Sequence, residues 1–292
     1  MRAFILAAGK GTRLLPYSSI LPKPLFPILG QPILKIILKQ LISVNLTNIG
    51  INCWYLKESL ISFLNTFSKS FPEVNLQIFE EKELLGTGGA LINARSFFKD
   101  TTLVINSDIL TNLNFKNILR AHESIGTPVS MVFYKGHNNN VEIDLEKRIV
   151  KKFRTKGGST FTFAGIQVIE SELIKVLPCN FDLINSYEEL LKKGVKIGAI
   201  MVENSYIADI GTPESYLKVH EDLLLKRFEV KECPSFQTPV VFKNCVVKGK
   251  VEAKNWVFLE DCVIEDGVIL SKVVAWKGAR IKKGFYEWKI LV

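Results

Sequence analysis

The sequence predicts an α/β fold with a Rossmann-like, mostly parallel open sheet, followed by a small β-domain. Up to about residue 225, short apolar segments alternate with amphipathic segments of helical periodicity. Such alternation favours a parallel sheet that is covered by helices on both faces. Beyond Lys226 the helical periodicity stops and a valine-rich, glycine-spaced tail begins. We therefore expect two domains, residues 1–228 and residues 229–292.

The predicted elements of the first domain follow from their apolar patterns. The strands are expected at Ala3–Ala8, Asn48–Asn52, Leu76–Phe79, Thr102–Ile105, Val129–Tyr134, Phe163–Ile169 and Ile197–Val202. The helices are expected at Ile33–Val44, Leu56–Ser68, Gly89–Phe98, Leu113–Ile125 and Ser186–Lys193. In open sheets of this kind, ligands bind beyond the carboxyl ends of the strands. The segments that follow the first and fourth strands are therefore candidate site segments.

The tail carries a repeat of about six residues, the period of hexapeptide coils. Its apolar positions are Val240, Val246, Val251, Val257, Val263, Ile269 and Val274, and KNCVV, KNWVF and EDCVI repeat one theme. This pattern resembles a left-handed β-helix, whose coils must stack to bury their faces. A small antiparallel β-domain is the alternative. A β-helix would also offer a surface for self-association into a homo-oligomer.

The first strand leads directly into a glycine turn with positive charge. Ala3–Ala8 is followed by Gly9-Lys10-Gly11-Thr12-Arg13, and Lys23 follows between Pro22 and Pro24. The glycines let backbone N–H groups approach a bulky anion, and the prolines stiffen the chain around the lysine. Together these features predict a nucleoside-triphosphate site.

Two commoner phosphate-binding motifs do not fit this turn. A dinucleotide fingerprint needs a third glycine where Leu14 stands. A Walker P-loop needs four residues between its glycines, whereas Gly9 and Gly11 are separated by one. An ordinary strand and turn with a surface Arg13 is the remaining alternative, and the combination of GxGTR with PKP disfavours it.

These motifs resemble those of the sugar-1-phosphate nucleotidyltransferases, whose pattern is G-x-G-T-R followed by P-K-P. The resemblance extends to EEKELLGTGGAL, to VINSDIL, to ADIGTP and to the β-helical tail, and so covers nearly the whole chain. It implies an enzyme in which a sugar 1-phosphate attacks the α-phosphate of an NTP. The products are an NDP-sugar and pyrophosphate.

The resemblance also implies roles for individual residues. The expected catalytic residues are Arg13, Lys23 and Asp108, and Asp108 and Asp209 are expected to bind Mg²⁺, which prefers one or two carboxylates plus substrate phosphates. The expected nucleotide-binding residues are Leu6, Ala7, Ala8, Gly9, Gly11, Thr12, Arg13, Glu81, Gly86 and Thr87. The expected sugar-binding residues are Asp108, Gly165, Tyr206 and Asp209.

Glu81 stands where related enzymes read the nucleobase. A carboxylate accepts two N–H groups of guanine, or one N–H group of uracil, so the partner is GTP or UTP. A solvated acidic loop formed by Glu80, Glu81 and Glu83 is the alternative. The pattern TFAGIQV is closest to mannose-1-phosphate guanylyltransferases and N-acetylmuramate-1-phosphate uridylyltransferases. We expect a guanylyltransferase that uses mannose 1-phosphate or heptose 1-phosphate, with a UTP-dependent uridylyltransferase or a non-catalytic regulatory subunit as alternatives.

The chain departs from the family pattern at the sugar side. Ser107 replaces a glycine before Asp108, and Phe163 replaces an asparagine before Ala164-Gly165. The family's E-K-P motif is absent, and Arg154 or Lys156 is expected to replace its lysine.

Composition excludes several other classes. The net charge is +9, but the lysines are scattered, which argues against nucleic-acid binding. No apolar run approaches a membrane span. The cysteines form no CxxC pair, which argues against zinc or a disulfide framework and for a cytoplasmic protein. We expect His122, His137 and His220 at the surface.

Overall fold

The computed structural model describes residues 1–136, 141–155 and 161–292. The chain divides into two compact units that are not continuous in sequence. The first unit comprises residues 1–10, 38–109 and 113–205, and the second comprises residues 11–37, 110–112 and 206–292. The second unit therefore contains the P-K-P segment as well as the tail. The predicted domain boundary at residue 228 stays a prediction.

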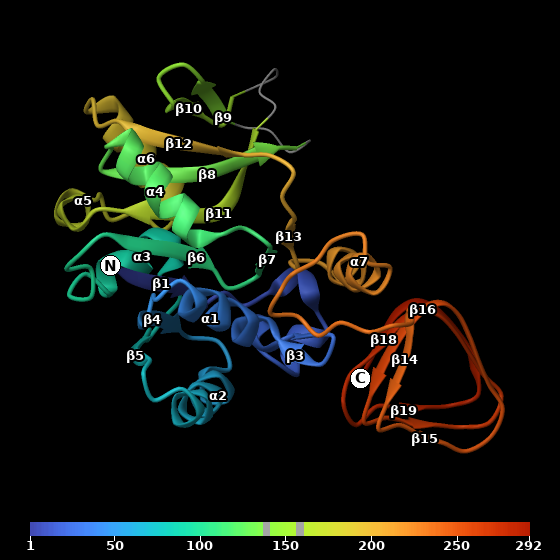
Figure 1. The fold of residues 1–292 in the computed structure, drawn as a ribbon. Coiled ribbons are helices and arrows are strands. Elements are labelled where there is room, and N and C mark those ends of the chain that lie inside the picture. Colours follow the sequence, from blue (N-terminus) through green and yellow to red (C-terminus); the bar gives the residue numbers. More distant parts are fainter. Residues whose placement is uncertain (137–140, 156–160) are drawn as a thin grey trace. The chain divides into compact units, whose positions relative to one another are not determined.

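A large mixed sheet forms the centre of the first unit (Figure 1). In spatial order its strands are β5 (Asn75–Glu80), β4 (Asn48–Cys53), β1 (Arg2–Leu6), β6 (Thr102–Asn106), β11 (Phe161–Ile169), β8 (Val129–Lys135), β12 (Ile197–Val202), β10 (Ile149–Phe153) and β9 (Val141–Asp144). Strands β11 and β10 run against the others, so the sheet is mostly parallel, as predicted. The carboxyl ends of β1, β4, β5 and β6 consequently meet at one edge.

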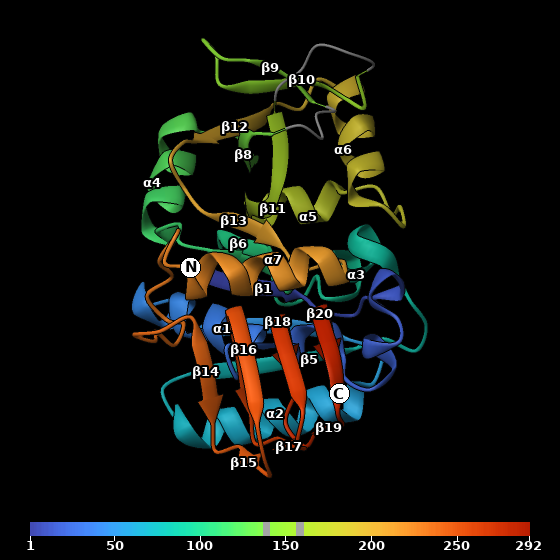
Figure 2. The same cartoon turned by 90° about the vertical axis from the view of Figure 1, so that its right-hand side faces the viewer.

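Helices cover both faces of this sheet. They are α2 (Lys57–Ser70), α3 (Gly86–Asn93), α4 (Phe115–Ile125), α5 (Ser171–Val176) and α6 (Leu183–Lys192), and the unit boundary at residue 38 falls inside α1 (Ile33–Ser43). Figure 2 shows α4 and α6 on opposite sides of β8 and β12. Local chemistry starts two of these helices, because the Asn114 and Asp182 side chains accept backbone N–H groups at the first turns of α4 and α6.

The second unit combines short turns, one helix and the tail. Its short elements are η1 (Thr12–Leu14), η2 (Tyr17–Ser19), η3 (Lys23–Leu25), the β2–β3 hairpin (Pro27–Ile28 and Gln31–Pro32), and β13 (Ile207–Asp209), which pairs with β7 (Ile109–Thr111). Its helix α7 (Pro213–Leu224) begins at a capping box in which Thr212 and Ser215 bond to each other's backbone.

The tail forms parallel strands consistent with a β-helix. One sheet contains β14 (Val240–Lys243), β16 (Val251–Glu260), β18 (Val268–Ala275) and β20 (Gly284–Leu291), and another contains β15 (Val246–Val247), β17 (Val263–Ile264) and β19 (Arg280–Ile281). Partner residues such as Val240 and Val257 lie 17 positions apart, which fits three steps of about six residues per coil. The corner residues Asn244, Asp261 and Gly278 share this spacing and all have positive φ. The predicted left hand of the coil stays a prediction.

Most predicted elements exist, with two kinds of difference. Helix α3 begins at Gly86 and includes the glycines, whereas the sequence predicted its start at Gly89. Ala7 and Ala8 lie beyond the end of β1. The strands β9 and β10 and the helix α7 were not among the predicted elements. Among the described residues, no helix is both long and apolar enough to cross a lipid bilayer.

Candidate active site

Buried polar side chains join the carboxyl ends of β1, β4 and β5. The backbone N–H of Ala7 donates to Oδ1 of Asn52 over 2.7 Å, and Nδ2 of Asn52 donates to Oε1 of Glu81 over 2.7 Å. The backbone N–H of Leu85 donates to Oε2 of Glu81 over 3.0 Å. We call Ala7, Asn52, Glu81 and Leu85 the Glu81 network. It ties the end of β1 to the segment that leads into α3.

The burial of Glu81 excludes the solvated acidic loop that the sequence left open for this residue. Its side chain is 3% exposed and that of Asn52 is 2% exposed. Each carboxylate oxygen already accepts one hydrogen bond and keeps one further acceptor position. Direct reading of the base by Glu81 stays a prediction, and the geometry adds a second role, positioning of the turn before Gly86. Sequence reasoning missed Asn52, although a polar residue at the end of an apolar strand was the available signal.

The glycines at the start of α3 allow very close packing. Gly86 has φ +72°, and a Cβ there would lie 2.2 Å from the carbonyl oxygen of Phe181. Gly88 N–H donates to that carbonyl over 3.1 Å, and the hydroxyl of Thr87 accepts the N–H of Leu183 over 3.0 Å. The predicted nucleotide-binding residues Gly86 and Thr87 therefore lie at a helix N-terminus that is fixed by its neighbours.

Asp108 follows β6, next to the end of β1. The N–H of Ser107 donates to the carbonyl of Leu6 over 3.0 Å, which fixes the start of this turn. Gly165 lies in β11 with φ +71°, and a Cβ there would come within 3.0 Å of side chains of Asn106 and Ile109. Glycine at this position thus lets β11 pass close to the segment that carries Asp108. Both residues belong to the first unit.

Three charged residues from separate motifs meet in the second unit. Nζ of Lys23 lies 3.5 Å from Oδ1 of Asp209, and a guanidinium nitrogen of Arg13 lies 3.8 Å from Oδ2. The side chain of Lys23 is 11% exposed, whereas those of Arg13 and Asp209 are 66% and 47% exposed. We call these residues the Lys23 cluster. It joins the GxGTR, PKP and DxGTP motifs and presents two cations beside one carboxylate.

Comparison with known proteins shows that this chain matches a family model. Residues 2–226 match the model described as nucleotidyl transferase. The chain belongs to the nucleotidyl transferase family. The predicted resemblance is therefore confirmed.

Relatives of this chain carry several names. The chain is 31% identical over 284 residues to the bifunctional protein GlmU of Methanococcus maripaludis, covering 92% of this chain but only 61% of that relative. It is 27% identical over 314 residues to a probable mannose-1-phosphate guanylyltransferase 1 of Oryza sativa subsp. japonica, covering 97% of this chain and 83% of the relative.

A solved structure shares the fold. It is a putative glucose-1-phosphate thymidylyltransferase from Bacillus anthracis in complex with sucrose, with a TM-score of 0.66 and 19% sequence identity. The match covers 75% of this chain and 93% of that chain. At this identity the likeness concerns the fold, and it confirms the predicted architecture of this chain.

Carboxylates occupy both positions at which the sequence predicts magnesium ligands, Asp108 and Asp209. Mg²⁺ takes one or two carboxylates and completes its shell with water and phosphate oxygens. Within the described ranges, no three His, Cys, Asp or Glu side chains gather into a site that would hold a metal unaided. Asp108 belongs to the first unit and Asp209 to the second, and binding of Mg²⁺ by these two residues stays a prediction.

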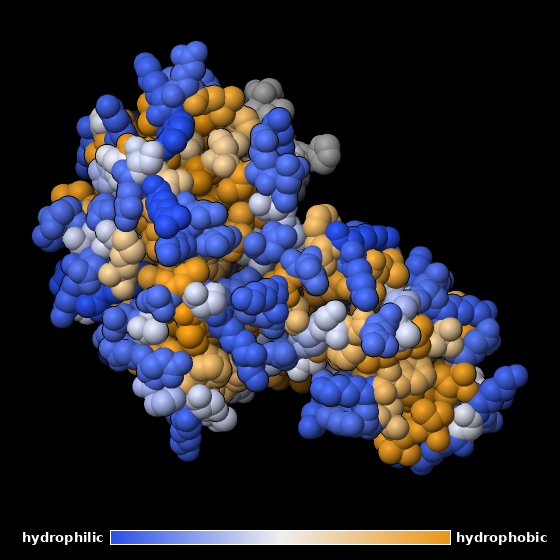
Figure 3. Space-filling model, in the orientation of Figure 1, coloured by the Kyte–Doolittle hydropathy of each residue, from blue (hydrophilic) through white to orange (hydrophobic). Residues whose placement is uncertain are grey.

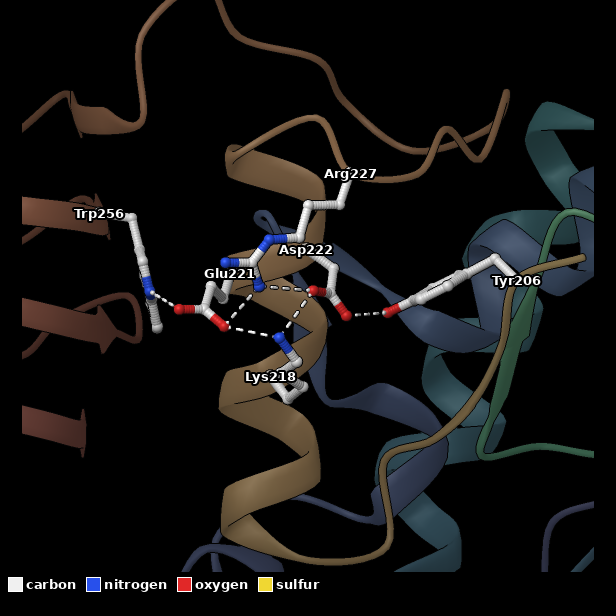
Figure 4. Close-up of polar contacts among 6 residues, drawn as sticks. All are labelled: Tyr206, Lys218, Glu221, Asp222, Arg227 and Trp256. Atoms are coloured by element: carbon white, nitrogen blue, oxygen red, sulfur yellow. Dashed lines mark hydrogen bonds and ion pairs between the residues drawn. The ribbon is translucent and has the colours of Figure 1, made fainter. Parts of the chain in front are cut away.

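Tyr206 is buried within the second unit, and Figure 4 shows its polar contact. Its hydroxyl donates to Asp222 over 3.4 Å, and its ring stacks on Phe228 with centroids 4.6 Å apart. Burial, and then the neighbouring carboxylate of Asp222, raise the pKa of Tyr206. Contact between Tyr206 and the sugar stays a prediction that this burial does not favour.

The same polar network binds α7 to the β-helix. Lys218 and Arg227 each pair with Glu221 and with Asp222, and the indole N–H of Trp256 donates to Glu221 over 3.3 Å (Figure 4). The hydrogen bond from Lys218 is the main cause that lowers the pKa of Glu221. The end of α7 is thus fixed to β16.

The proposed replacement for the missing lysine finds other partners. The guanidinium of Arg154 donates to Asp182 and Asn185 over 2.6 Å each and to Glu188 over 3.2 Å, which ties it to the start of α6. Lys156 lies outside the described residues. Arg154 as a sugar-phosphate ligand stays a prediction.

The prediction of surface histidines is wrong for His122 and His220, which are buried on the inner faces of α4 and α7. His122 lies between Ser130 (2.8 Å) and Glu170 (3.0 Å). Ser130 is fully enclosed, so this Ser–His–Glu row has no access to a substrate. His137 lies outside the described residues.

Proposed function

We propose that this protein transfers a nucleoside monophosphate from an NTP to a sugar 1-phosphate. The observation that carries the proposal is the Lys23 cluster, in which Arg13 and Lys23 lie 3.8 Å and 3.5 Å from Asp209. Motifs that are far apart in the sequence bring two cations and a carboxylate together there. Such a group suits a polyphosphate with a metal ion.

The proposed reaction needs no protein nucleophile. An oxygen of the sugar phosphate attacks the α-phosphorus of the NTP, the bond between the α-phosphorus and the bridging oxygen breaks, and pyrophosphate leaves. Lys23 would bind the α-phosphate and the sugar phosphate, and Arg13 would neutralise the leaving pyrophosphate. Preorganised cations of this kind stabilise the charge that develops in the transition state. Mg²⁺, when bound by Asp108 and Asp209, would neutralise further phosphate charge.

We propose GTP as the nucleotide and mannose 1-phosphate as the acceptor, with heptose 1-phosphate as a second acceptor. The probable guanylyltransferase of Oryza sativa, which aligns with 97% of this chain, supports this choice. The carboxylate of Glu81 supports it as well, because it has one acceptor position left on each oxygen for two N–H groups of guanine. A UTP-dependent reaction is the second candidate within the same class.

The test is pyrophosphate release with Mg²⁺ across a grid of substrates. GTP, UTP, dTTP, ATP and CTP are each combined with mannose, heptose, glucose, N-acetylglucosamine and N-acetylmuramate 1-phosphates. The variant Asp108→Ala should lose the activity, whereas Asp100→Ala, an exposed aspartate paired with Arg2, should keep it. Activity with GTP and mannose or heptose 1-phosphate supports the full proposal. Activity with UTP alone would replace GTP by UTP as the proposed nucleotide. The absence of pyrophosphate release with every pair of substrates would favour a non-catalytic regulatory subunit.

We also propose that the protein forms a homo-oligomer through its β-helix and that it is located in the cytoplasm. Phe242, Val246 and Val247 of β14 and β15 are exposed, and Figure 3 shows apolar side chains gathered over this part of the chain. The cysteines are free thiols, which fits a reducing compartment. Light scattering coupled to size exclusion, with Val246→Lys as the variant, tests the association.

A further inference from the structure

The segment that carries Lys23 continues into a buried hairpin. The N–H of Phe26 donates to the carbonyl of Lys23 over 3.1 Å, and the N–H of Ile33 donates to the carbonyl of Phe26 over 3.0 Å. Between these bonds, Pro27 and Ile28 form β2 of the hairpin. The position of the Lys23 backbone therefore depends on how firmly Phe26 and Pro27 are held.

An indole from the β-helix packs against this hairpin. Trp276 directly follows β18 and is only 7% exposed. Its ring meets the fully buried ring of Phe26 edge to face, with centroids 4.8 Å apart and planes at 74°. Edge-to-face pairs are the favoured geometry for aromatic rings, because the positive edge of one ring faces the negative face of the other. The contact fixes the orientation of both rings.

A hydrogen-bond relay adds a second point of attachment. Nε1 of Trp276 donates to the hydroxyl of Tyr216 over 2.9 Å, and this hydroxyl donates to the carbonyl of Pro27 over 2.5 Å. Tyr216 is fully buried, so a broken relay would leave polar atoms unpaired away from water. The relay therefore holds Pro27 at one defined position.

Two side chains on one face of α7 form hydrogen bonds with the same hairpin. Tyr216 and His220 are four residues apart and so lie on the same face of the helix. Nε2 of His220 accepts the N–H of Leu29 over 3.3 Å, and Nδ1–H donates to the carbonyl of Tyr216 over 2.9 Å. Figure 2 shows α7 alongside the ends of β16, β18 and β20. The segment just before α7 carries Asp209, the partner of Lys23.

We propose that the C-terminal β-helix takes part in the transfer reaction by positioning Lys23, with Trp276 as its positioning residue. Trp276 acts on Phe26 directly and on Pro27 through Tyr216, and Asp209 lies in the segment that leads into α7. We call Phe26, Tyr216, His220 and Trp276 the Trp276 anchor. The inference rests on the proposed nucleotidyl transfer, and it gives the β-helix a role besides self-association.

Two variants separate the parts of the anchor. Trp276→Phe keeps an aromatic ring beside Phe26 but removes the N–H donor, and Tyr216→Phe removes the relay hydroxyl. A small displacement of a charged group costs up to about 100-fold in rate, so each variant should lower kcat by roughly 5- to 50-fold. Trp288→Phe is the matched control, because Trp288 lies on β20 and packs on Trp256 instead.

The decisive experiment measures the effect of Trp276→Phe both in the wild-type protein and in the Lys23→Ala variant. If Trp276 acts through Lys23, Trp276→Phe should have no further effect on kcat once Lys23 is absent. A residue that only stabilises the fold would lower activity by the same factor in both backgrounds. Equal factors, or an unchanged kcat in Trp276→Phe alone, would overturn the inference.

Hydrogen exchange distinguishes this inference from the proposed function. In Trp276→Phe, amides of residues 25–33 should exchange at least several-fold faster, and those of residues 240–264 should not change. If exchange is faster but the wild-type protein releases no pyrophosphate with any substrate, the Trp276 anchor is supported and the proposed transfer reaction is rejected. Unchanged exchange across residues 25–33 would reject the anchor, whether or not the protein is active.

Discussion

The Glu81 network and the Lys23 cluster hold their charged groups in opposite ways. Glu81 is buried, and backbone and amide N–H groups satisfy its carboxylate. The side chains of Arg13 and Asp209 are 66% and 47% exposed, and they interact through charge over 3.8 Å. Buried hydrogen bonds are directional and costly to break, whereas exposed ion pairs are weak and adjustable. We therefore propose that the first region sets which base is accepted and that the second attracts and neutralises phosphate.

The largest expected effect comes from removing Lys23, the less exposed of the two cations in the Lys23 cluster. Lys23→Ala should lower kcat/KM by roughly 100- to 1000-fold, the usual loss when one preorganised donor to transition-state charge is removed. The matched control is Lys69→Ala at an exposed position of α2, which should stay within about twofold of wild type. Steady-state kinetics of pyrophosphate release measures both. A loss below tenfold would show that Lys23 is not a main phosphate ligand.

Acid should weaken the hairpin that follows Lys23 before it weakens the strands of the Glu81 network. Burial lowers the pKa of His220 from 6.5 to about 4. Between these values the unfolded chain binds more protons than the folded chain, so the free energy of unfolding falls as pH drops from 6.5 towards 4. The full effect is about 3 kcal/mol. Protonation would also place two N–H groups against each other at Leu29.

Urea unfolding across pH 4 to 7.5 measures this dependence. His220→Gln should flatten the stability profile between pH 6.5 and 4, and hydrogen exchange should show residues 25–33 loosening before residues 48–53. An identical slope in the variant would mean that other groups cause the acid sensitivity.

Glu81→Gln tests whether the first region reads the base directly. If Glu81 accepts two guanine N–H groups, the preference for GTP over UTP should fall by roughly 10- to 100-fold. If Glu81 only positions the turn before Gly86, kcat/KM should fall by a similar factor for every NTP. Glu83→Gln, at an exposed site in the same segment, should change neither. The ratio of kcat/KM values for GTP and UTP decides between the two roles.

Added salt should produce the smallest effect, and it should affect the Lys23 cluster but not the Glu81 network. Exposed charges are screened within about 10 Å at 0.1 M salt, so raising KCl from 50 to 500 mM should raise the KM for NTP by about two- to fivefold. The ratio between GTP and UTP should not change, because the Glu81 network is buried. A salt-dependent base preference would contradict the proposed division of roles.

Local sequence was sufficient for the main architecture. The apolar runs at β1, β4, β6 and β12 predicted strands within two residues of their observed ends, because buried strands have a strong local pattern. The strands β9 and β10 were missed because their pattern mixes polar and apolar residues at the edge of the sheet. The six-residue repeat predicted stacked coils, and the parallel pairing of the tail agrees.

The chemistry of the site motifs could also be predicted from local sequence. The residues with which the motif side chains form hydrogen bonds could not. GxGTR, PKP and DxGTP indicated phosphate chemistry from residue type and spacing alone. The hydrogen bonds of Asn52 with Glu81, and of Trp276 with Tyr216, join residues 29 and 60 positions apart. No local pattern specifies such pairs, because they depend on strand register and on how a helix face meets a sheet.

By itself, the sequence determined the alternation of strands and helices, the coil repeat of the tail and the chemical character of each motif, because these depend on neighbours along the chain. Only the tertiary structure decided that Glu81 is buried, that His220 is enclosed with its pKa lowered by burial, and that Lys23 lies beside Asp209. Burial and long-range pairing arise when segments that are distant in sequence exclude water together. That exclusion, rather than residue type, sets how strongly each charged group acts.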